Sequence, residues 1–539
     1  MNILLVEPDY KNKYPPMGLM KISTYHKNRG DNVLFFKGIM KKRLFDADSF
    51  DRVYITSLFT FHYDLTVKTI WEYQKLVSPS KIYVGGIMAT LMESKLRNDI
   101  GEETKILTGL LNDSKDIEFD DNENIDRLPL DYSILDDISF KYSAGDNYFA
   151  YISRGCTNKC KFCAVPILEP EFCMTNNIIN QVNTIKKQFG EKQNLLLLDN
   201  NILSFDVESL QQIVNDIKSL GFDKSTKYYP ELPLLNYIKK LERLDISSIA
   251  RNNILSELIA YLHEKMTVKK SKNYQDKFLQ LITSLDEAED KYAYIIDNLA
   301  VFTEILRFYH RPTGRRRTVD FNQGIDARQL SDEKMAVLAQ IPIEPFRLAF
   351  DGIAYEKVYT EAVKTATHHG VGSFSNYLLY NFEDKPEDLW LRLKLNIELA
   401  KECHIKIFSF PMKYAPIDRT DRIYIGRHWN RVFLSNIYAI LNVTKGIVAE
   451  GSAFFEKAFG KDIDEYFEIL SMPREFVMYR SFFESNGLSF EWKTRYNALD
   501  IQERHDLINI VSTGQRTENQ AINDILPYYK IKRKDVEDK

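Results

Sequence analysis

Three cysteines lie close together in the segment YISRGCTNKCKFCAVP, residues 151–166. Three residues separate Cys156 from Cys160, and two separate Cys160 from Cys163. Thiolates bind zinc ions and iron–sulfur clusters, and a closed zinc site needs four ligands. The loop supplies only three, since the next cysteine, Cys173, belongs to a different run of the sequence. A site built from this loop therefore either recruits a ligand from elsewhere or keeps one position open.

Two metal chemistries are compatible with three thiolates. Structural zinc would require Cys173 or a histidine, although closed zinc sites usually combine two short-spaced pairs of ligands, and Cys403 stands alone. Iron–sulfur clusters normally have a thiolate on every iron, so three thiolates on a four-iron cluster leave one iron open to an exogenous ligand. The loop follows an expected strand, YFAYISRG, and barrel enzymes carry their chemistry at the C-terminal ends of strands. We therefore favour the open cluster, with a non-enzymatic zinc or iron–sulfur adaptor protein as the alternative.

The spacing Cys-x3-Cys-x2-Cys at the end of a first barrel strand, with Phe162 before the last cysteine, resembles the radical S-adenosylmethionine (radical SAM) superfamily. The resemblance covers residues 148–222 and 317–430. It implies that Cys156, Cys160 and Cys163 hold a [4Fe-4S] cluster whose open iron chelates S-adenosyl-L-methionine (SAM). It further implies that one electron from a flavodoxin- or ferredoxin-type donor cleaves SAM to a 5′-deoxyadenosyl radical, which abstracts hydrogen from a substrate.

The resemblance extends to polar residues at the end of the second expected strand. In LDNNIL (198–203), Asp199 and Asn200 occupy the place where the family holds the amino group of SAM, although the common Gly-Gly-Glu form is absent. A purely structural alternative is that Asn201 or Ser204 caps a helix in this segment.

Later strand ends supply the remaining candidate SAM contacts. In FNQGIDARQL, Asn322 and Asp326 are an even number of residues apart, so one strand can present both to the barrel interior. Arg328 could hold a carboxylate through two hydrogen bonds, or lie on the surface at the start of a helix. Asp351 ends LAFDG, where the family often has an acidic SAM contact; helix capping is the alternative. The turn after the fifth strand, usually glycine-rich in the family, carries Asn381 instead.

The elements that must position these residues are predicted from apolar periodicity. In residues 1–110, the apolar runs NILLVEP, NVLFF, RVYITSLFTF, KIYVGG and KILTG alternate with helical segments such as GLMKISTYHKNRG, which ends at Gly30. This alternation predicts a doubly wound parallel sheet. Six further apolar runs, from YFAYISRG to IKIFSF, alternate with helices or loops and predict an incomplete α/β barrel.

The N-terminal segment also resembles the cobalamin-binding-like, Rossmann-like domain that precedes many radical SAM barrels. The turn at Pro15 and Pro16 and the strand end at Gly85 and Gly86 carry the match. Met88, however, stands where relatives often have histidine, and the ligand motif Asp-x-His-x-x-Gly is absent. We expect a domain that kept the fold and lost cobalamin, with a cobalamin-dependent radical SAM methyltransferase as the alternative.

The remaining segments are predicted to be helical. No glycine occurs between Gly221 and Gly314, where apolar residues recur at helical spacing, and the last nine residues, IKRKDVEDK, are expected to be a disordered tail. The expected parts of this α/β protein are a cobalamin-binding-like Rossmann domain (1–125), a linker (126–147), a radical SAM partial (β/α)6 barrel of the TIM type (148–222 and 317–430), a helical insertion (223–316) and a helical C-terminal domain (431–539).

A basic run, RFYHRPTGRRRTVD, ends the insertion and combines arginines with aromatic residues, as nucleic-acid sites do. Arg311, Arg315, Arg316 and Arg317 are the candidate contacts, so a nucleic-acid-modifying radical SAM enzyme is a further alternative. The net charge of −4 gives the whole chain no basic bias, and a solvated turn is the simpler interpretation.

Composition indicates a cytoplasmic protein without a membrane partner. The chain is 44% hydrophobic and 27% charged, as soluble globular proteins are, and contains no apolar run of membrane-spanning length and no basic leader. Five cysteines, three of them clustered, suit a reducing compartment and argue against a disulfide framework. We expect Cys173 and Cys403 to be buried as small apolar residues.

Overall fold

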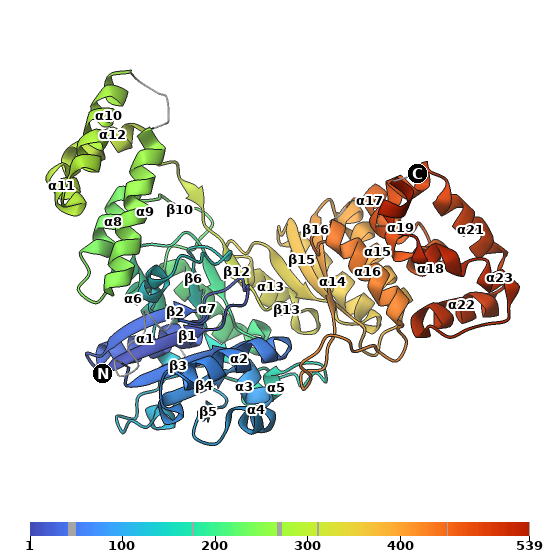
Figure 1. Ribbon diagram of the computed structural model, residues 1–539. Helices are drawn as coiled ribbons and strands as arrows, with labels where there is room; N and C mark the ends of the chain where they lie inside the picture. The colour runs from blue at the N-terminus through green and yellow to red at the C-terminus, as the bar shows by residue number, and fades with distance from the viewer. Residues whose placement is uncertain (41–49, 175–176, 267–271, 310–311, 450, 538–539) are drawn as a thin grey trace.

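The computed structural model describes residues 1–40, 50–174, 177–266, 272–309, 312–449 and 451–537. A helical column projects from the N-terminal part of the molecule, and a second group of helices lies at the opposite end (Figure 1). The predicted α/β class is confirmed, because parallel strands alternate with helices between these two helical regions.

A five-stranded sheet forms the N-terminal part. Its strands are β1 (Asn2–Glu7), β2 (Asn32–Lys37), β3 (Arg52–Ser57), β4 (Ile82–Gly86) and β5 (Lys105–Leu107). Its helices are α1 (Met17–Asn28), α2 (Tyr63–Gln74), α3 (Ile87–Leu91) and α4 (Glu93–Ile100). All neighbouring strands are parallel, in the order β2-β1-β3-β4-β5. Side chains alternate between the faces, so Leu5 joins the core that includes α1, and Leu4 joins the core that includes α2.

The segment 126–147, predicted as a linker, is packed against its neighbours. It includes most of one 3-10 helix and all of another, η6 (Ile125–Arg127) and η7 (Tyr132–Asp137). Asp131 accepts a hydrogen bond from the hydroxyl of Ser23 in α1 at 2.6 Å, and Asp137 accepts one from the backbone N–H of Phe35 in β2 at 2.8 Å. Since both aspartates are buried, the connection is held firmly to the first sheet.

Parallel strands and helices alternate through the central part of the chain. The strands are β6 (Tyr148–Ala150), β9 (Leu195–Leu197), β12 (Val319–Phe321), β13 (Ile325–Asp326), β14 (Phe346–Ala349), β15 (Ser373–Tyr380) and β16 (Lys406–Lys413). The helices between them are α6 (Ile178–Phe189), α7 (Val207–Ser219), α13 (Asp332–Leu338), α14 (Glu356–His368) and α15 (Pro386–Cys403). These strands fall on the six apolar runs expected from the sequence, and the run at residues 319–326 contains both β12 and β13.

The central strands form two parallel sheets, ordered β12-β9-β6 and β13-β14-β15-β16. A parallel bridge between Val319 of β12 and Ile343, just before β14, joins them. β12 and β13 are consecutive in the chain, and Gly324 between them has a φ of 94°, which favours glycine. Across the two joined sheets, the strands therefore lie side by side in the order in which they occur in the chain. The assignment of these sheets to an incomplete (β/α)6 barrel, and of the N-terminal sheet to a Rossmann-like domain, remains a prediction.

The helical insertion has a core of its own. Its helices are α8 (Pro233–Leu241), α9 (Ser248–Met266), α10 (Lys272–Glu287), α11 (Lys291–Asp297) and α12 (Leu299–Tyr309). Leu258, Phe278 and Phe302 are buried among these helices. The insertion leaves and returns through an antiparallel pair, β10 (Lys227–Tyr228) and β11 (Arg315–Arg316), close to the first residues of β9 and β12. It projects away from the sheets (Figure 1).

The C-terminal part is helical as predicted. Its helices are α16 (Arg431–Val443), α17 (Ser452–Phe459), α18 (Ile463–Ser471), α19 (Arg474–Met478), α20 (Arg480–Ser485), α21 (Leu488–Ala498), α22 (Ile501–Thr513), α23 (Gln520–Asn523) and α24 (Arg533–Glu537). The prediction of a disordered tail is wrong for residues 531–537, because Ile531 and Val536 pack against the main core. Among the described helices, none combines the length and apolar character that crossing a membrane requires.

Candidate functional site

The three cysteines lie on a loop whose ends are joined by a short antiparallel pair of strands. β7 (Ser153–Arg154) precedes the loop and β8 (Cys173–Met174) follows it. The loop leaves from the C-terminal end of β6, where the chain of a parallel α/β protein presents its functional residues. Cys173 is exposed on β8, so the expectation that it is buried is wrong, whereas Cys403 is partly buried at the end of α15.

The three thiols share one environment. Burial raises the pKa of Cys160 and Cys163, and the negative charge of neighbouring thiolates, including that of Cys156, acts in the same direction. The backbone N–H of Asn158 donates to the Sγ of Cys156 at 3.4 Å, and that of Val165 donates to the Sγ of Cys163 at 3.5 Å. Such donors favour the thiolate form, which is the form that binds metal.

The metal-binding donors of the loop are its three thiols. Within the described residues, no three His, Cys, Asp or Glu side chains converge as ligands of one metal ion. A zinc site completed by Cys173 is therefore not preformed. A four-iron cluster is wider than one ion, and its ligands are thiolates whose sulfurs accept hydrogen bonds. Three thiols on one loop, two of them with N–H donors, match that chemistry.

Two of the predicted SAM contacts lie beside the loop, at and just after β13. The Oδ2 of Asp326 accepts a hydrogen bond from the side-chain amide of Asn158, between the first two cysteines, at 2.6 Å. Arg328 donates to Asp326 through Nε at 2.9 Å and Nη2 at 2.8 Å, and its charge acts on the thiol of Cys160. Its side chain is 37% exposed, so the guanidinium places a positive charge at the accessible side of the cysteine loop.

Asp351, just after β14, completes this group. Burial raises its pKa to about 6, against the opposing charges of Arg392 and Arg328. Its charge acts on both Cys160 and Cys163, which places it near the loop. No group of the described residues donates a hydrogen bond to its carboxylate, so this acid is available to a ligand.

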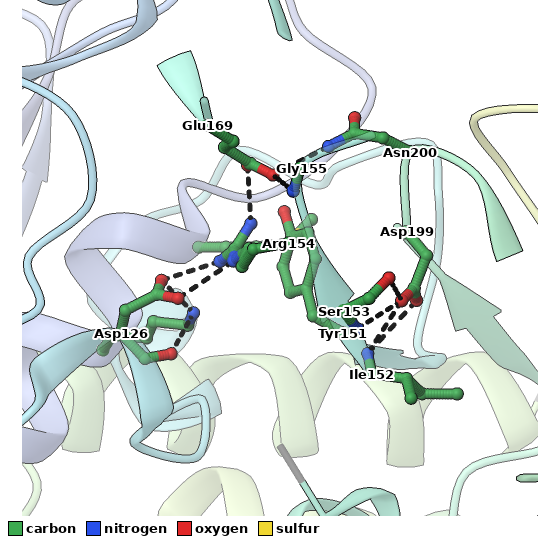
Figure 2. Close-up of polar contacts among 11 residues, drawn as sticks. Asp126, Tyr151, Ile152, Ser153, Arg154, Gly155, Glu169, Asp199 and Asn200 are labelled. Carbon is green, nitrogen blue, oxygen red and sulfur yellow. Dashed lines mark hydrogen bonds and ion pairs between the residues drawn. The ribbon is translucent and has the colours of Figure 1, made fainter. Parts of the chain in front are cut away.

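The carboxylate of Asp199, another predicted SAM contact, accepts hydrogen bonds from other groups of the protein. It accepts them from the backbone N–H of Ile152 at 3.1 Å and from the N–H and hydroxyl of Ser153 at 2.5 and 2.6 Å (Figure 2). These bonds hold the chain that enters the cysteine loop. Asp199 is 3% exposed, and the geometry therefore gives it a positioning role.

Asn200 and Asn322 also have protein partners. The side-chain amide of Asn200 donates to Glu169 at 2.7 Å, while Asn201 caps η8 (Ile202–Ser204), as the structural alternative anticipated. The side chain of Asn322 accepts a hydrogen bond from the hydroxyl of Tyr14, which lies in the turn after β1. The structure thus groups Asp326, Arg328 and Asp351 with the cysteines, and places Asp199, Asn200 and Asn322 in supporting contacts.

Phe162 begins a row of aromatic rings that leads away from the loop. Its ring meets that of Phe382 edge-on, with centroids 5.8 Å apart, and Phe382 contacts Tyr414 at 4.7 Å. Asn381 has a φ of 69° and donates to the backbone carbonyls of Tyr414 and Tyr424 at 3.1 Å each. The asparagine therefore fixes the segment after β16 beside the cysteine loop.

A buried charge network beneath the loop was missed by the sequence analysis. The guanidinium of Arg154 lies between the carboxylates of Asp126 and Glu169 (Figure 2). Lys21 of α1 donates to Asp126 at 2.7 Å, and Glu169 accepts from the backbone N–H of Gly155 at 2.7 Å. Two cations and two carboxylates balance in charge, as buried ionic groups must. The only sequence signal was the position of Arg154 directly before Gly-Cys.

Gly155 cannot be replaced without moving the chain. Its φ is 75°, in the region that favours glycine, and a Cβ there would lie 2.1 Å from the carbonyl oxygen of Glu171. The loop entrance therefore depends on glycine for both its conformation and its close packing.

The basic run is not the continuous patch that the sequence suggested. Arg317 is 3% exposed and donates to Glu191 at 3.0 Å, so its assignment as a nucleic-acid contact is wrong. Arg315 and Arg316 are exposed on β11. Arg311 lies outside the described residues.

The histidines of the N-terminal part bear on cobalamin binding. Met88 is fully buried in the core, and His26 is fully buried between Asp31 and Tyr54. His62, in the segment after β3, stacks on a neighbouring tyrosine at a centroid distance of 4.9 Å. The buried side chains of Met88 and His26 cannot ligate a corrinoid at the C-terminal edge of the five-stranded sheet. The partly exposed His62 lies at that edge.

No protein-family model matches this chain, and no curated protein matches it. Among solved structures, it resembles that of the radical S-adenosylmethionine methyltransferase TsrM from Kitasatospora setae with cobalamin and a [4Fe-4S] cluster bound. The identity is 11%, the TM-score is 0.41, and the match covers 77% of this chain and 74% of that one. Similarity at this level transfers neither residues nor activity.

Proposed function

We propose that the chain is a radical SAM enzyme, with a Rossmann-like N-terminal domain and an incomplete (β/α)6 barrel, in which Cys156, Cys160 and Cys163 hold a [4Fe-4S] cluster. The observation that carries the proposal is the three-thiol loop at the C-terminal end of β6. Asp351 and Arg328, the carboxylate and the cation proposed to bind the amino and carboxylate groups of SAM, lie beside the same loop.

When bound, such a cluster supplies the electron that cleaves SAM to methionine and a 5′-deoxyadenosyl radical, which abstracts hydrogen from the substrate. The residues of the chain bind and orient SAM. Asp351, whose carboxylate has no donor among the described residues, is placed to accept hydrogen bonds from an ammonium group. Arg328 is placed to bind a carboxylate, while its ion pair with Asp326 fixes its orientation.

The proposal is tested by anaerobic reconstitution, reduction with dithionite and addition of SAM, with 5′-deoxyadenosine measured by mass spectrometry. We expect the product from the wild-type protein and from Cys173→Ala, and none from Cys156→Ala, Cys160→Ala or Cys163→Ala. Absence of the product with about four irons bound per chain would contradict the proposal. One tightly bound zinc and no iron would support the non-enzymatic adaptor instead.

A second candidate, a cobalamin-dependent radical SAM methyltransferase, is favoured by one observation. The hydroxyl of Tyr14, after β1, donates to Asn322, after β12, so the C-terminal edges of the two parts of the molecule meet. A corrinoid at the first edge would then be near the cysteine loop. This candidate predicts corrinoid absorbance in the purified protein under cobalamin supply and S-adenosylhomocysteine as a product; the absence of both rejects it.

A further inference from the structure

The C-terminal helices line a partly open pocket that is separate from the cysteine loop. It has a volume of about 410 Å³ and lies between α16, α17, α19, α20 and the start of α24. In Figure 1 these helices belong to the group at the end of the molecule opposite the insertion. Small-molecule sites usually measure about 300–1,000 Å³ and are mostly apolar with a few polar groups. The pocket has the size of a site for one small ligand.

The walls of the pocket are largely apolar. Ile440 and Val477 form buried parts of the wall, while Val443 is 68% exposed and Phe454 is 40% exposed. Apolar surface left in water is unfavourable by roughly 25 cal/mol per Å². A ligand with an apolar body would cover these side chains.

The polar part of the lining carries positive charge. Lys457, Arg480 and Arg533 line the pocket, and no Asp or Glu does so. The side chain of Arg480 is only 17% exposed. It forms a long ion pair with the exposed Glu484 at 3.9 Å, beyond hydrogen-bond distance, and the charges of Glu465 and Glu468 also act on it. Within the described residues, no carboxylate forms an ion pair with Lys457. Arg533 lies over the ring of Tyr479 at 5.0 Å.

Among the described residues, no group accepts a hydrogen bond from the largely buried guanidinium of Arg480, although Glu484 pairs with it at longer range. Burying polar groups without hydrogen bonds is costly. An anion in the pocket would supply the missing acceptor. The apolar walls and the cations together define the chemistry of the occupant.

We propose that this pocket binds a small amphipathic anion, with an apolar body against Val443, Phe454 and Val477 and a carboxylate on Arg480 and Lys457. The assignment is independent of the proposed radical SAM activity, because it involves neither the cysteine loop nor SAM.

Decanoate is a suitable probe, and its binding to the full-length protein can be measured by isothermal titration calorimetry without a cluster. We expect saturable binding of decanoate, and at least tenfold weaker binding of decylammonium, which has the same tail, and of acetate, which has the same head. Equal binding of decanoate and decylammonium would overturn the proposal, since the apolar walls alone would then account for it.

Variants locate the site. Arg480→Gln should weaken decanoate binding about tenfold, because this arginine is largely buried. Lys457→Gln should weaken it by less than tenfold, because this lysine is exposed. The control is Arg516→Gln, an exposed arginine outside the pocket, which should bind as the wild type does. If Arg480→Gln unfolds at a lower temperature than the wild type, the Lys457→Gln variant still provides the test, because Lys457 is exposed. Wild-type affinity in both Arg480→Gln and Lys457→Gln would overturn the proposal.

Discussion

The guanidinium of Arg154 forms a two-point ion pair with the carboxylate of Asp126, with Nε–Oδ2 and Nη2–Oδ1 distances of 2.9 and 2.7 Å. Both side chains are more than nine-tenths buried, at 7% and 9% exposed. Arg154 stands two residues before Cys156, and Asp126 lies in the segment that leaves the N-terminal sheet. The pair therefore ties the cysteine loop to the first part of the molecule.

Asp126→Asn should destabilise the fold by about 3–5 kcal/mol, because Arg154 and Lys21 would remain buried with one carboxylate fewer. Urea unfolding, followed by hydrogen exchange of peptides from α1 and the cysteine loop, measures the effect. The control is Asp116→Asn, at an exposed position on a 3-10 helix. A loss below about 1 kcal/mol, similar to that of a surface ion pair, would contradict this role.

Glu169→Gln should weaken the hold on the loop entrance, and it should also lower stability because two buried cations would keep one carboxylate. The carboxylate accepts from Gly155, Asn200 and Arg154, and an amide can satisfy only part of this set because its nitrogen is a donor. We expect a lower iron content after reconstitution and faster loss of iron to a chelator. Glu171→Gln, an exposed neighbour, is the matched control, and equal iron retention in both variants would argue against an anchoring role.

Gly155→Ala should be far more damaging than Gly514→Ala. The φ values of the two glycines are 75° and 76°, but a Cβ at residue 514 would meet no atom within 4 Å, whereas one at residue 155 would collide with Glu171. Positive φ alone costs an alanine about 1–2 kcal/mol, so any larger loss at residue 155 measures the collision. The comparison uses thermal unfolding and iron content. Similar losses in both variants would show that the loop entrance can adjust.

Acidification should destabilise the N-terminal sheet through His26. Burial lowers the pKa of its imidazole to about 4, while the unfolded chain titrates near the ordinary value of about 6.5. The unfolded state therefore binds more protons between these values, and stability falls by up to about 3 kcal/mol as the pH drops from 6.5 to 4. Asp137, whose pKa burial raises to about 6, acts in the opposite direction over part of this range.

His26→Gln isolates the histidine term, because glutamine keeps a donor and an acceptor without titrating. Hydrogen exchange of α1 peptides, corrected for intrinsic rates, should show a smaller loss of protection between pH 7 and pH 5 in the variant. An unchanged pH dependence would mean that other groups control acid stability.

The sequence was sufficient where the signal is local. Apolar runs indicated the strands, and the spacing of Cys156, Cys160 and Cys163 indicated a shared site. The pairing of Arg154 with Asp126 could not be predicted, because the two residues are brought together only by tertiary packing. Likewise, Arg317 appeared as a surface charge in an arginine run, but it stacks on Phe222 at 3.9 Å and pairs with Glu191. Neither partner lies near it in the sequence.

The most direct test of an open iron at the cysteine loop is the EPR spectrum of the reconstituted, dithionite-reduced protein, recorded with and without SAM. We expect a [4Fe-4S]+ signal whose g values shift when SAM is added, in the wild type and in Cys173→Ala, and no such signal in Cys160→Ala. A reduced cluster whose spectrum is unchanged by saturating SAM would contradict the proposed function.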